Sequence, residues 1–214
     1  MEKLKENKKT LIITSILVLL PIVIGLVLWD KLPDKIATHF DGNGVADGWS
    51  NKGFAIFGMP LFILAVHLIC SIATSADPKN QRINDKIFKL ILWICPVVSW
   101  FGNLSIYAYA LEFKYNPATL AMVLVGIIFI VIGNYLPKCR QNYTVGIKLP
   151  WTLHDEENWN RTHRFAGKLW MFGGIFFSIL AITRVGNTWL LPAIMIVLAI
   201  VPMIYSFLYY LRHK

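Results

Sequence analysis

The stretch TLIITSILVLLPIVIGLVLW, residues 10–29, contains no charged side chain, and 14 of its 20 residues are Leu, Ile or Val. Near the centre of a membrane-spanning helix, each such residue favours insertion by about 0.3 to 0.6 kcal/mol. Twenty helical residues rise about 30 Å, which matches the thickness of the hydrocarbon core. The stretch therefore predicts a membrane-spanning helix. A cleaved secretory signal fits less well, because its apolar part would be shorter and a small-residue cleavage site would follow Trp29.

Five further apolar stretches of similar length follow, at residues 54–73, 89–111, 118–136, 165–183 and 189–211. Charged residues make up 15% of the 214-residue chain and hydrophobic residues 56%, whereas soluble domains have about 25% charged residues. Within lipid, the backbone hydrogen bonds of each stretch must close internally, which requires helices. The sequence thus predicts an all-α, polytopic membrane protein with six transmembrane helices in a single membrane domain, residues 1–214. A soluble enzyme core does not fit this composition.

Basic residues set the expected orientation of these helices. With the N-terminus inside the cell, 16 of the 21 Lys and Arg residues fall on the cytoplasmic side. This bias is the positive-inside pattern, so both termini are predicted to be cytoplasmic in a multi-pass protein of the plasma membrane. Residues 30–53 then form an extracellular loop, and residues 137–164 form a cytoplasmic loop. Aromatic residues at the helix ends fit interfacial belts: Trp29 and Trp189 outside, and Tyr205, Tyr209 and Tyr210 inside.

The extracellular loop contains the run DGNGVAD, residues 41–47, which superficially resembles a calcium-binding loop. The pattern fails, because Ala46 stands where glycine is required and Lys52 stands where glutamate is required. Gly and Asn clusters of this kind form tight turns. We expect a solvated, turn-rich loop, in which His39 and Asp47 are candidates to contact an external ligand.

The cytoplasmic loop contains a predicted helix start, because Thr152 is followed by Asp155 and two glutamates. If this helix continues without a break to Thr183, its first part, residues 153–164, should lie in the membrane interface and lead into the fifth span. Trp159, His163 and Gly167 are spaced four apart and share one face of that helix.

Two interpretations of this interfacial helix remain open. In the first, it is an amphipathic ramp, on which Trp159 anchors at the headgroups and Arg161, Arg164 and Lys168 extend to anionic lipid. In the second, polar residues form a site together with segment 146–151; they are Asn158, Arg161, Thr162, His163 and Arg164. Residue types alone do not decide between the two.

Few patterns in the chain indicate catalysis or metal binding. The cysteines Cys70, Cys95 and Cys139 follow no disulfide or zinc spacing, and no His-Glu-x-x-His, Gly-x-Ser-x-Gly or phosphate-loop motif is present. His67 lies within a predicted span and either has a function or bonds to a neighbouring helix. Neither His67 nor His163 has an identifiable partner for acid–base catalysis. We predict no enzyme activity, no metal and no cofactor.

Two sequence signatures resemble a known family. The stretches NYTVGIKLPWTL, residues 142–153, and NWNRTHRFAG, residues 158–167, are similar to the signature of the SdpI family of bacterial membrane immunity proteins. The segment LPDKIATHF, residues 32–40, with Gly44, Asp47, Gly48 and Trp49, resembles the domain of unknown function that commonly heads such proteins.

The resemblance implies a plasma-membrane protein that protects a bacterium against a secreted, membrane-active peptide toxin. Its partners would be the lipid bilayer, the toxin and, as a further expectation, a cytoplasmic transcriptional repressor, without direct nucleic acid binding. The candidate ligand- or partner-binding residues are Asn142, Gly146, Pro150, Trp151, Asn158, Trp159, Arg161, Thr162, His163, Arg164, His39 and Asp47.

Other functions remain as alternatives. The helices divide as three plus three, each half with a long loop after its first helix, which is the outline of an inverted repeat in a small secondary transporter. A role in envelope stress or in sensing would equally need no catalytic site.

Overall fold

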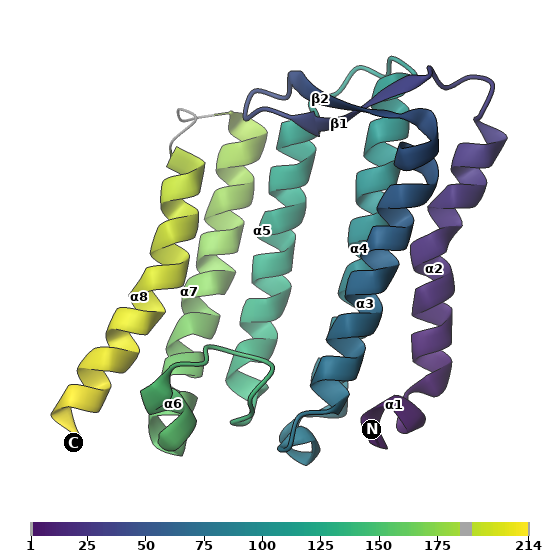
Figure 1. Cartoon of the computed structure of the whole chain (residues 1–214). Coiled ribbons are helices and arrows are strands. Elements are labelled where there is room, and N and C mark those ends of the chain that lie inside the picture. The colour runs from purple at the N-terminus through teal and green to yellow at the C-terminus, as the bar shows by residue number, and fades with distance from the viewer. Residues whose placement is uncertain (1, 185–189, 214) are drawn as a thin grey trace. The chain divides into compact units, whose positions relative to one another are not determined.

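The computed structural model describes residues 2–184 and 190–213. In this part of the chain, six helices are long and apolar enough to cross a membrane. They are α2 (Lys8–Val27), α3 (Met59–Ser75, preceded by the π-helical turn Phe54–Gly58), α4 (Asp85–Ala110), α5 (Pro117–Tyr135), α7 (Glu156–Thr183) and α8 (Leu190–Arg212) (Figure 1). The predicted fold class is confirmed, and the chain is a multi-pass membrane protein. Predicted belt residue Trp189 lies outside the described residues.

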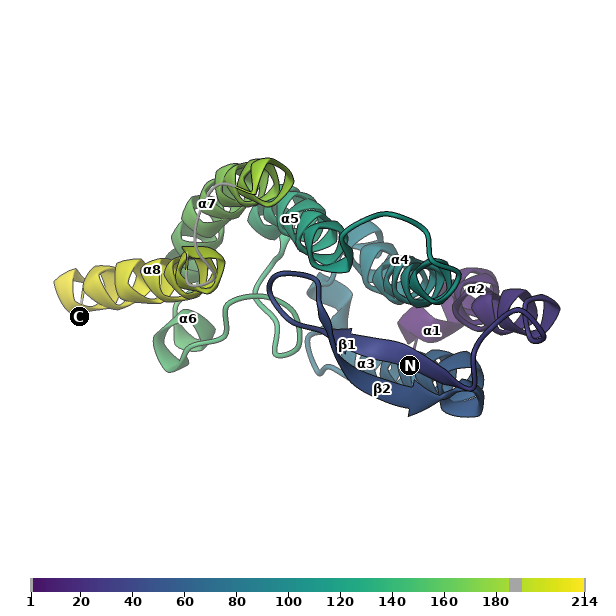
Figure 2. The same ribbon diagram turned by 90° about the horizontal axis from the view of Figure 1, so that it is seen from above.

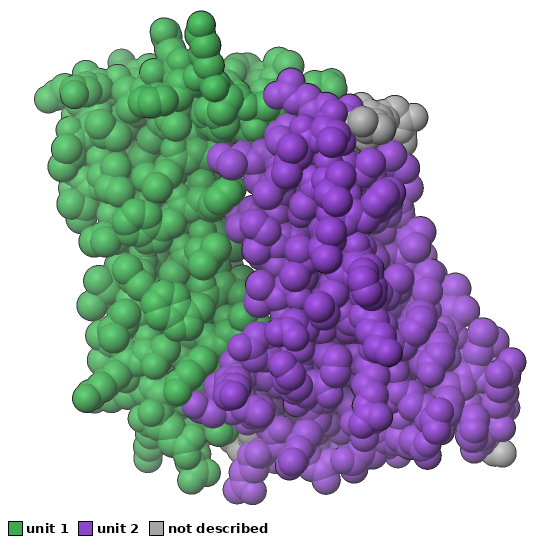
Figure 3. Space-filling view, turned by 180° about the vertical axis from the view of Figure 1, so that it is seen from behind, with its two compact units in different colours: residues 1–75, 88–118 green, residues 76–87, 119–214 purple. Residues whose placement is uncertain are grey.

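Shorter elements connect these spans. They are α1 (Glu2–Glu6), the strands β1 (Lys35–Phe40) and β2 (Ala46–Asn51), the 3₁₀ turns Asn80–Arg82 and Leu136–Lys138, and α6 (Pro150–His154) (Figure 2). The chain forms two compact units, each with three spans (Figure 3). Unit 1 comprises residues 1–75 and 88–118, and unit 2 comprises residues 76–87 and 119–214.

The core of unit 1 lies where α2 meets the turn before α3 and the end of α4. Ile56 and Tyr107 are buried there, beside Gly25 of α2. A Cβ atom at Gly25 would stand 2.8 Å from both the Ile56 side chain and the Tyr107 hydroxyl. A glycine at this position therefore lets the helices approach closely, as small residues do between membrane helices.

Proline in α2 leaves a carbonyl that the helix cannot satisfy. Pro21 has no backbone N–H, so the carbonyl of Leu17, four residues earlier, lacks its usual donor. The indole Nε1 of Trp100 in α4 donates to this oxygen at 2.9 Å. A neighbouring helix thus supplies the missing hydrogen bond, which lipid could not provide.

The same solution occurs in unit 2. Pro202 lies inside α8 and frees the carbonyl of Leu198, four residues earlier. The indole Nε1 of Trp170 in α7 donates to that carbonyl at 2.8 Å. Each unit therefore has a proline-containing helix whose freed carbonyl binds a tryptophan of a neighbouring helix.

His67 is buried in α3, and its Nε2 lies 3.1 Å from the hydroxyl of Thr14 in α2. The histidine therefore bonds to a neighbouring helix, one of the two roles expected for it. Its Nδ1 has no hydrogen-bond partner among the described residues.

The loop of residues 30–53 contains an antiparallel hairpin, β1 with β2, that the sequence did not predict. Its turn has the expected chemistry. The Asp41 carboxylate accepts hydrogen bonds from the backbone amides of Val45, at 2.8 Å, and Asn43, at 2.9 Å, while Gly44 adopts φ +84°. These bonds, that of Val45 first, hold the pKa of Asp41 below its ordinary value. The strands were missed because they are short and mostly polar.

We expect Trp100→Phe to lower the free energy of unfolding by about 1 kcal/mol, because the Leu17 carbonyl loses its donor. Trp93→Phe is the control, since Trp93 is half-exposed on the same helix. In a Pro21→Ala background, residue 21 regains its N–H and the cost of Trp100→Phe should shrink. Reversible unfolding in mixed micelles measures the wild type and the four variants; an equal cost of Trp100→Phe in both backgrounds would contradict the assignment.

Candidate functional site

The helix start expected at Thr152 lies instead at Asp155. Asp155 has extended backbone, φ −123° and ψ 112°, and separates α6 from α7. Its carboxylate accepts hydrogen bonds from the amides of Glu157, at 2.8 Å, and Asn158, at 3.2 Å. The prediction of one continuous helix from Thr152 was therefore wrong. An aspartate followed by two glutamates caps a helix as well as threonine does, and α7 therefore begins after Asp155.

Thr152 lies within α6 and has a different role, because it binds the backbone of the loop that precedes this helix. Its buried hydroxyl accepts a hydrogen bond from the amide of Leu149 at 2.9 Å and donates toward the carbonyl of Ile147 at 3.0 Å. Pro150 and Trp151, both predicted site residues, lie in the first turn of α6. The N–H that proline lacks would have no partner within the helix at this position.

His163 joins the loop to α7. Its Nε2 accepts a hydrogen bond from the amide of Ile147 at 3.0 Å, so Nδ1 carries the proton and donates to the carbonyl of Trp159 at 2.7 Å. The rings of Trp159 and His163 stack with centroids 4.0 Å apart. Because both ring nitrogens are engaged, His163 is a structural clamp and has no nitrogen left for proton transfer.

Gly146 allows the loop to approach this stacked pair. It adopts φ +116°, which L side chains rarely adopt. A Cβ atom there would meet Nε2 of His163 and lie 3.0 Å from the ring of Trp159.

Trp159 is fully buried, and its indole Nε1 donates to the carbonyl of Cys139 at 2.7 Å. The interpretation of Trp159 as an anchor at the headgroups was therefore wrong. Burial of this large ring against the loop gains more apolar contact than an interfacial position would.

Asn142 organises the first turn of the loop. Its Oδ1 accepts from the amides of Val145, at 2.6 Å, and Thr144, at 2.9 Å, and its Nδ2 donates to the carbonyl of Arg140 at 2.8 Å. The side chain is fully buried, so it replaces hydrogen bonds that the irregular backbone would otherwise lose.

Asp77 is a site residue that sequence reasoning missed. Its buried carboxylate accepts hydrogen bonds from the amide of Tyr143 at 2.8 Å and from the hydroxyl of Thr144 at 2.9 Å. Beside it, Lys79 Nζ donates to Gln141 Oε1 at 2.9 Å. Nothing in the sequence marked Asp77, because Asp85 is also acidic in the same short connection between two spans.

A second polar cluster joins α6, α7 and α8. The Oδ1 of Asn158 accepts hydrogen bonds from the hydroxyls of Ser206, at 2.7 Å, and Thr162, at 3.0 Å. The indole of Trp151 donates to the Ser206 hydroxyl at 2.9 Å. Asn158, Thr162 and Ser206 are fully buried. Sequence reasoning missed Ser206, because nothing near it in the chain marks it out.

The predicted polar site is thus divided between two faces of α7. Asn158, Thr162 and His163 face the loop and α8, whereas Arg161 and Arg164 are exposed. Arg161 binds Glu157 through Nε at 2.9 Å and through its terminal nitrogen at 2.8 Å. The two arginines therefore do not join the buried cluster.

The chemistry of the loop is that of a scaffold. Burial raises the pKa of the Cys139 thiol to about 11, so it stays protonated and unreactive at neutral pH. Among the described residues, no group of three His, Cys, Asp or Glu side chains could hold a metal ion. The buried polar groups satisfy one another and the backbone.

The remaining predicted residues lie in the hairpin of unit 1. His39 Nδ1 and Asp47 Oδ1 are 2.5 Å apart, and the two side chains are 73% and 49% exposed. They form a surface pair of their own within that unit.

Two protein families match this chain, one within each of the two units. Residues 138–206 match the SdpI/YfhL protein family, and residues 16–64 match a domain of unknown function, DUF1648. The resemblance to the SdpI family is confirmed. The chain is also 28% identical over 190 residues to "Immunity protein SdpI" of Bacillus subtilis (strain 168), covering 89% of this chain and 90% of that protein. These similarities support a membrane immunity function. No solved structure matches the chain.

We expect Gly146→Ala to destabilise unit 2 by roughly 2 to 4 kcal/mol, since it combines an unfavourable φ with overpacking against His163 and Trp159. Limited proteolysis of the loop and unfolding in mixed micelles measure the effect. Gly102→Ala is the control, because a Cβ there would meet nothing within 4 Å. Equal stability of the two variants would contradict the role of Gly146.

Proposed function

We propose that this protein is a plasma-membrane immunity protein that protects the cell against a secreted, membrane-active peptide toxin, with both termini in the cytoplasm. The observation that carries the proposal is the similarity to Immunity protein SdpI over 89% of the chain. Interception of a peptide requires recognition and no bond-breaking chemistry. The scaffold-like hydrogen bonding of the loop agrees with a function of this kind.

The hairpin of unit 1 is the proposed surface for the toxin. It exposes apolar side chains, with Val45 at 61% and Trp49 at 59% exposure, beside the polar pair of His39 and Asp47. A peptide that acts on membranes has its own apolar face, which such a surface can bind. In a two-stranded sheet, both strands also have free edges that can pair with an extended peptide.

Deletion of the gene should sensitise a toxin-exposed host, and Trp49→Ala should lower the tolerated toxin concentration about tenfold, as loss of a central aromatic contact does. Survival across a panel of membrane-active peptides measures both. Trp93→Ala, a half-exposed tryptophan on α4, is the control and should retain protection. Unchanged survival of the deletion strain across the panel would argue against immunity. Full protection by the Trp49 variant would argue against the hairpin surface.

We further propose that the loop of unit 2 signals to a cytoplasmic repressor. The buried clamps of Asn142 and His163 hold the loop in one conformation, and this conformation exposes Tyr143 and Lys148. Tyrosine is enriched in the interfaces between proteins, so the exposed Tyr143 is the main contact that we expect for the repressor.

Affinity capture with the full-length protein tests this role. Tyr143→Ala/Lys148→Ala should lose the repressor that the wild type retains, while Lys86→Ala, an exposed cation on the neighbouring segment, should retain it. Lys79 Nζ lies 4.7 Å from the centroid of the Tyr143 ring, so Tyr143→Ala/Lys148→Ala should lower the free energy of unfolding by about 1 kcal/mol at most, and Lys86→Ala should leave it unchanged. Identical partners for all three proteins would contradict the proposed signalling surface.

A further inference from the structure

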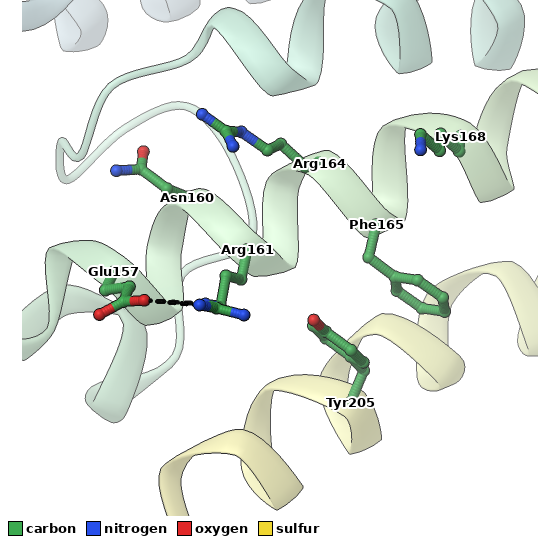
Figure 4. Close-up of a pocket in the computed structure, with 7 residues that line it drawn as sticks. All are labelled: Glu157, Asn160, Arg161, Arg164, Phe165, Lys168 and Tyr205. Carbon is green, nitrogen blue, oxygen red and sulfur yellow. Dashed lines mark hydrogen bonds and ion pairs between the residues drawn. The ribbon is translucent and has the colours of Figure 1, made fainter. Parts of the chain in front are cut away.

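A basic pocket lies along α7 and is bordered by α8 (Figure 4). Its volume is about 540 Å³, and it is lined by Glu157, Asn160, Arg161, Arg164, Phe165, Lys168 and Tyr205. Three of these side chains are cationic and one is anionic, which leaves a net charge of +2. The pocket faces away from the buried cluster of Asn158 and Thr162, and it has no part in the scaffold described above.

The three cations are aligned on one face of the helix. Arg161, Arg164 and Lys168 follow one another at spacings of three and four residues. Glu157 already neutralises Arg161, whose terminal nitrogen it binds at 2.8 Å. Arg164 and Lys168 are exposed and have no ion-pair or hydrogen-bond partner among the residues that the structure describes. Two cations are therefore available to an anion.

Arg164 and Lys168 lie about one helical turn apart, and a phosphate is the anion whose chemistry suits such a pair. A guanidinium binds phosphate oxygens with two parallel hydrogen bonds, and an ammonium adds a mobile point charge. Figure 4 shows the Glu157–Arg161 ion pair at one end of the pocket and an aromatic pair at the other. The rings of Phe165 and Tyr205 stack there with centroids 4.5 Å apart. The ligand should thus combine a phosphate with an apolar part.

An apolar stripe continues from the cations along the same face of α7. Phe172, Ile175 and Ile179 are 72%, 44% and 52% exposed, and they follow Lys168 at spacings of four, three and four residues. Along this face, the side chains are therefore charged up to Lys168 and apolar from Phe172 onward. A headgroup beside the cations would place acyl chains along the stripe, whereas a soluble phosphate would make no use of it.

The depth of the cations also favours a lipid. Twenty residues of helix, about the thickness of the hydrocarbon core, extend from Thr183 back to Arg164. Lys168 would then lie about 6 Å inside the core, where an unpaired charge is costly. Its side chain must reach toward the interface, and a phosphate held at Arg164 is the counter-ion it would meet.

From these observations, we propose that the α7–α8 pocket is a binding site for the phosphate of an anionic phospholipid, whose acyl chains lie along Phe172, Ile175 and Ile179. The proposed site shares no residue with the toxin surface or with the repressor surface, so the three proposals are tested by different variants.

The test is phosphatidylglycerol binding to purified full-length protein, measured by native mass spectrometry over a lipid titration. Wild type should retain one tightly bound phosphatidylglycerol. Arg164→Gln/Lys168→Gln should bind it roughly thirtyfold more weakly, because each cation near a lipid surface contributes about fivefold. Lys86→Gln/Arg140→Gln is the matched control, since it removes one exposed lysine and one exposed arginine elsewhere in unit 2. The control should bind as the wild type does.

Two further arms identify the ligand. Phosphatidylcholine with the same acyl chains should bind much more weakly, since its headgroup has no net charge. Glycerol phosphate, which lacks acyl chains, should not displace bound phosphatidylglycerol at millimolar concentration. Displacement by glycerol phosphate would overturn the lipid assignment and indicate a soluble phosphate ligand. Equal affinity for the two lipids would overturn the role of charge.

Equal retention of phosphatidylglycerol by wild type and Arg164→Gln/Lys168→Gln would overturn the site. If that variant does not fold, two others decide the matter. Lys168→Gln alone should weaken binding about fivefold, and the charge-preserving Arg164→Lys/Lys168→Arg should stay within about threefold of the wild type. A loss of binding in the charge-preserving variant equal to that in Lys168→Gln would also overturn the proposal.

Discussion

Satisfaction of buried backbone polar groups is the constraint on which this structure depends. Lipid offers no hydrogen-bond donors, so a carbonyl freed by proline within a span must find a partner on a neighbouring helix. For two of the three prolines in the interior of a described helix, this partner is a tryptophan: Trp100 for the carbonyl freed by Pro21, and Trp170 for the one freed by Pro202. Each indole also lies against the proline-containing helix, so the same residue supplies both packing and a hydrogen bond. Each of these two prolines is therefore linked to the pairing of its helix with a neighbour.

The same constraint shapes the loop between α5 and α7. This segment has little regular structure and yet lies against buried surface, so side chains must take the place of backbone partners. Asn142 binds the backbone of its own turn, His163 accepts from Ile147, and Asp77 accepts from Tyr143. An amide, an imidazole and a carboxylate thus all serve to hydrogen-bond the backbone of the loop. A polar residue in this loop is therefore first a substitute for secondary structure, and its contribution to recognition is to hold the exposed residues in place.

The fold could be predicted from the sequence because its cause is local. A charge-free stretch such as residues 10–29 predicts a span whatever surrounds it. The hairpin and the helix start at Asp155 could not, because short polar strands resemble loops and several residues in one stretch could cap the helix. For the candidate site, the sequence signatures identified Asn142, Gly146 and His163, whose contacts lie nearby in the chain. Asp77 and Ser206 were missed because their partners are 66 and 48 residues away.

The division of α7 into two faces decides how mutations in the family signature should be interpreted. An alanine at His163 or Trp159 removes a buried clamp, so a loss of function there reports on folding and carries no information about a ligand. An alanine at Arg164 or Lys168 leaves the core intact, so a loss there reports on what the exposed face binds. Substitutions at the adjacent residues His163 and Arg164 consequently measure different properties, folding and binding, although one signature contains both. A scan of the signature that treated its residues as one site would average a structural effect with a binding effect, and only stability measured alongside function separates the two.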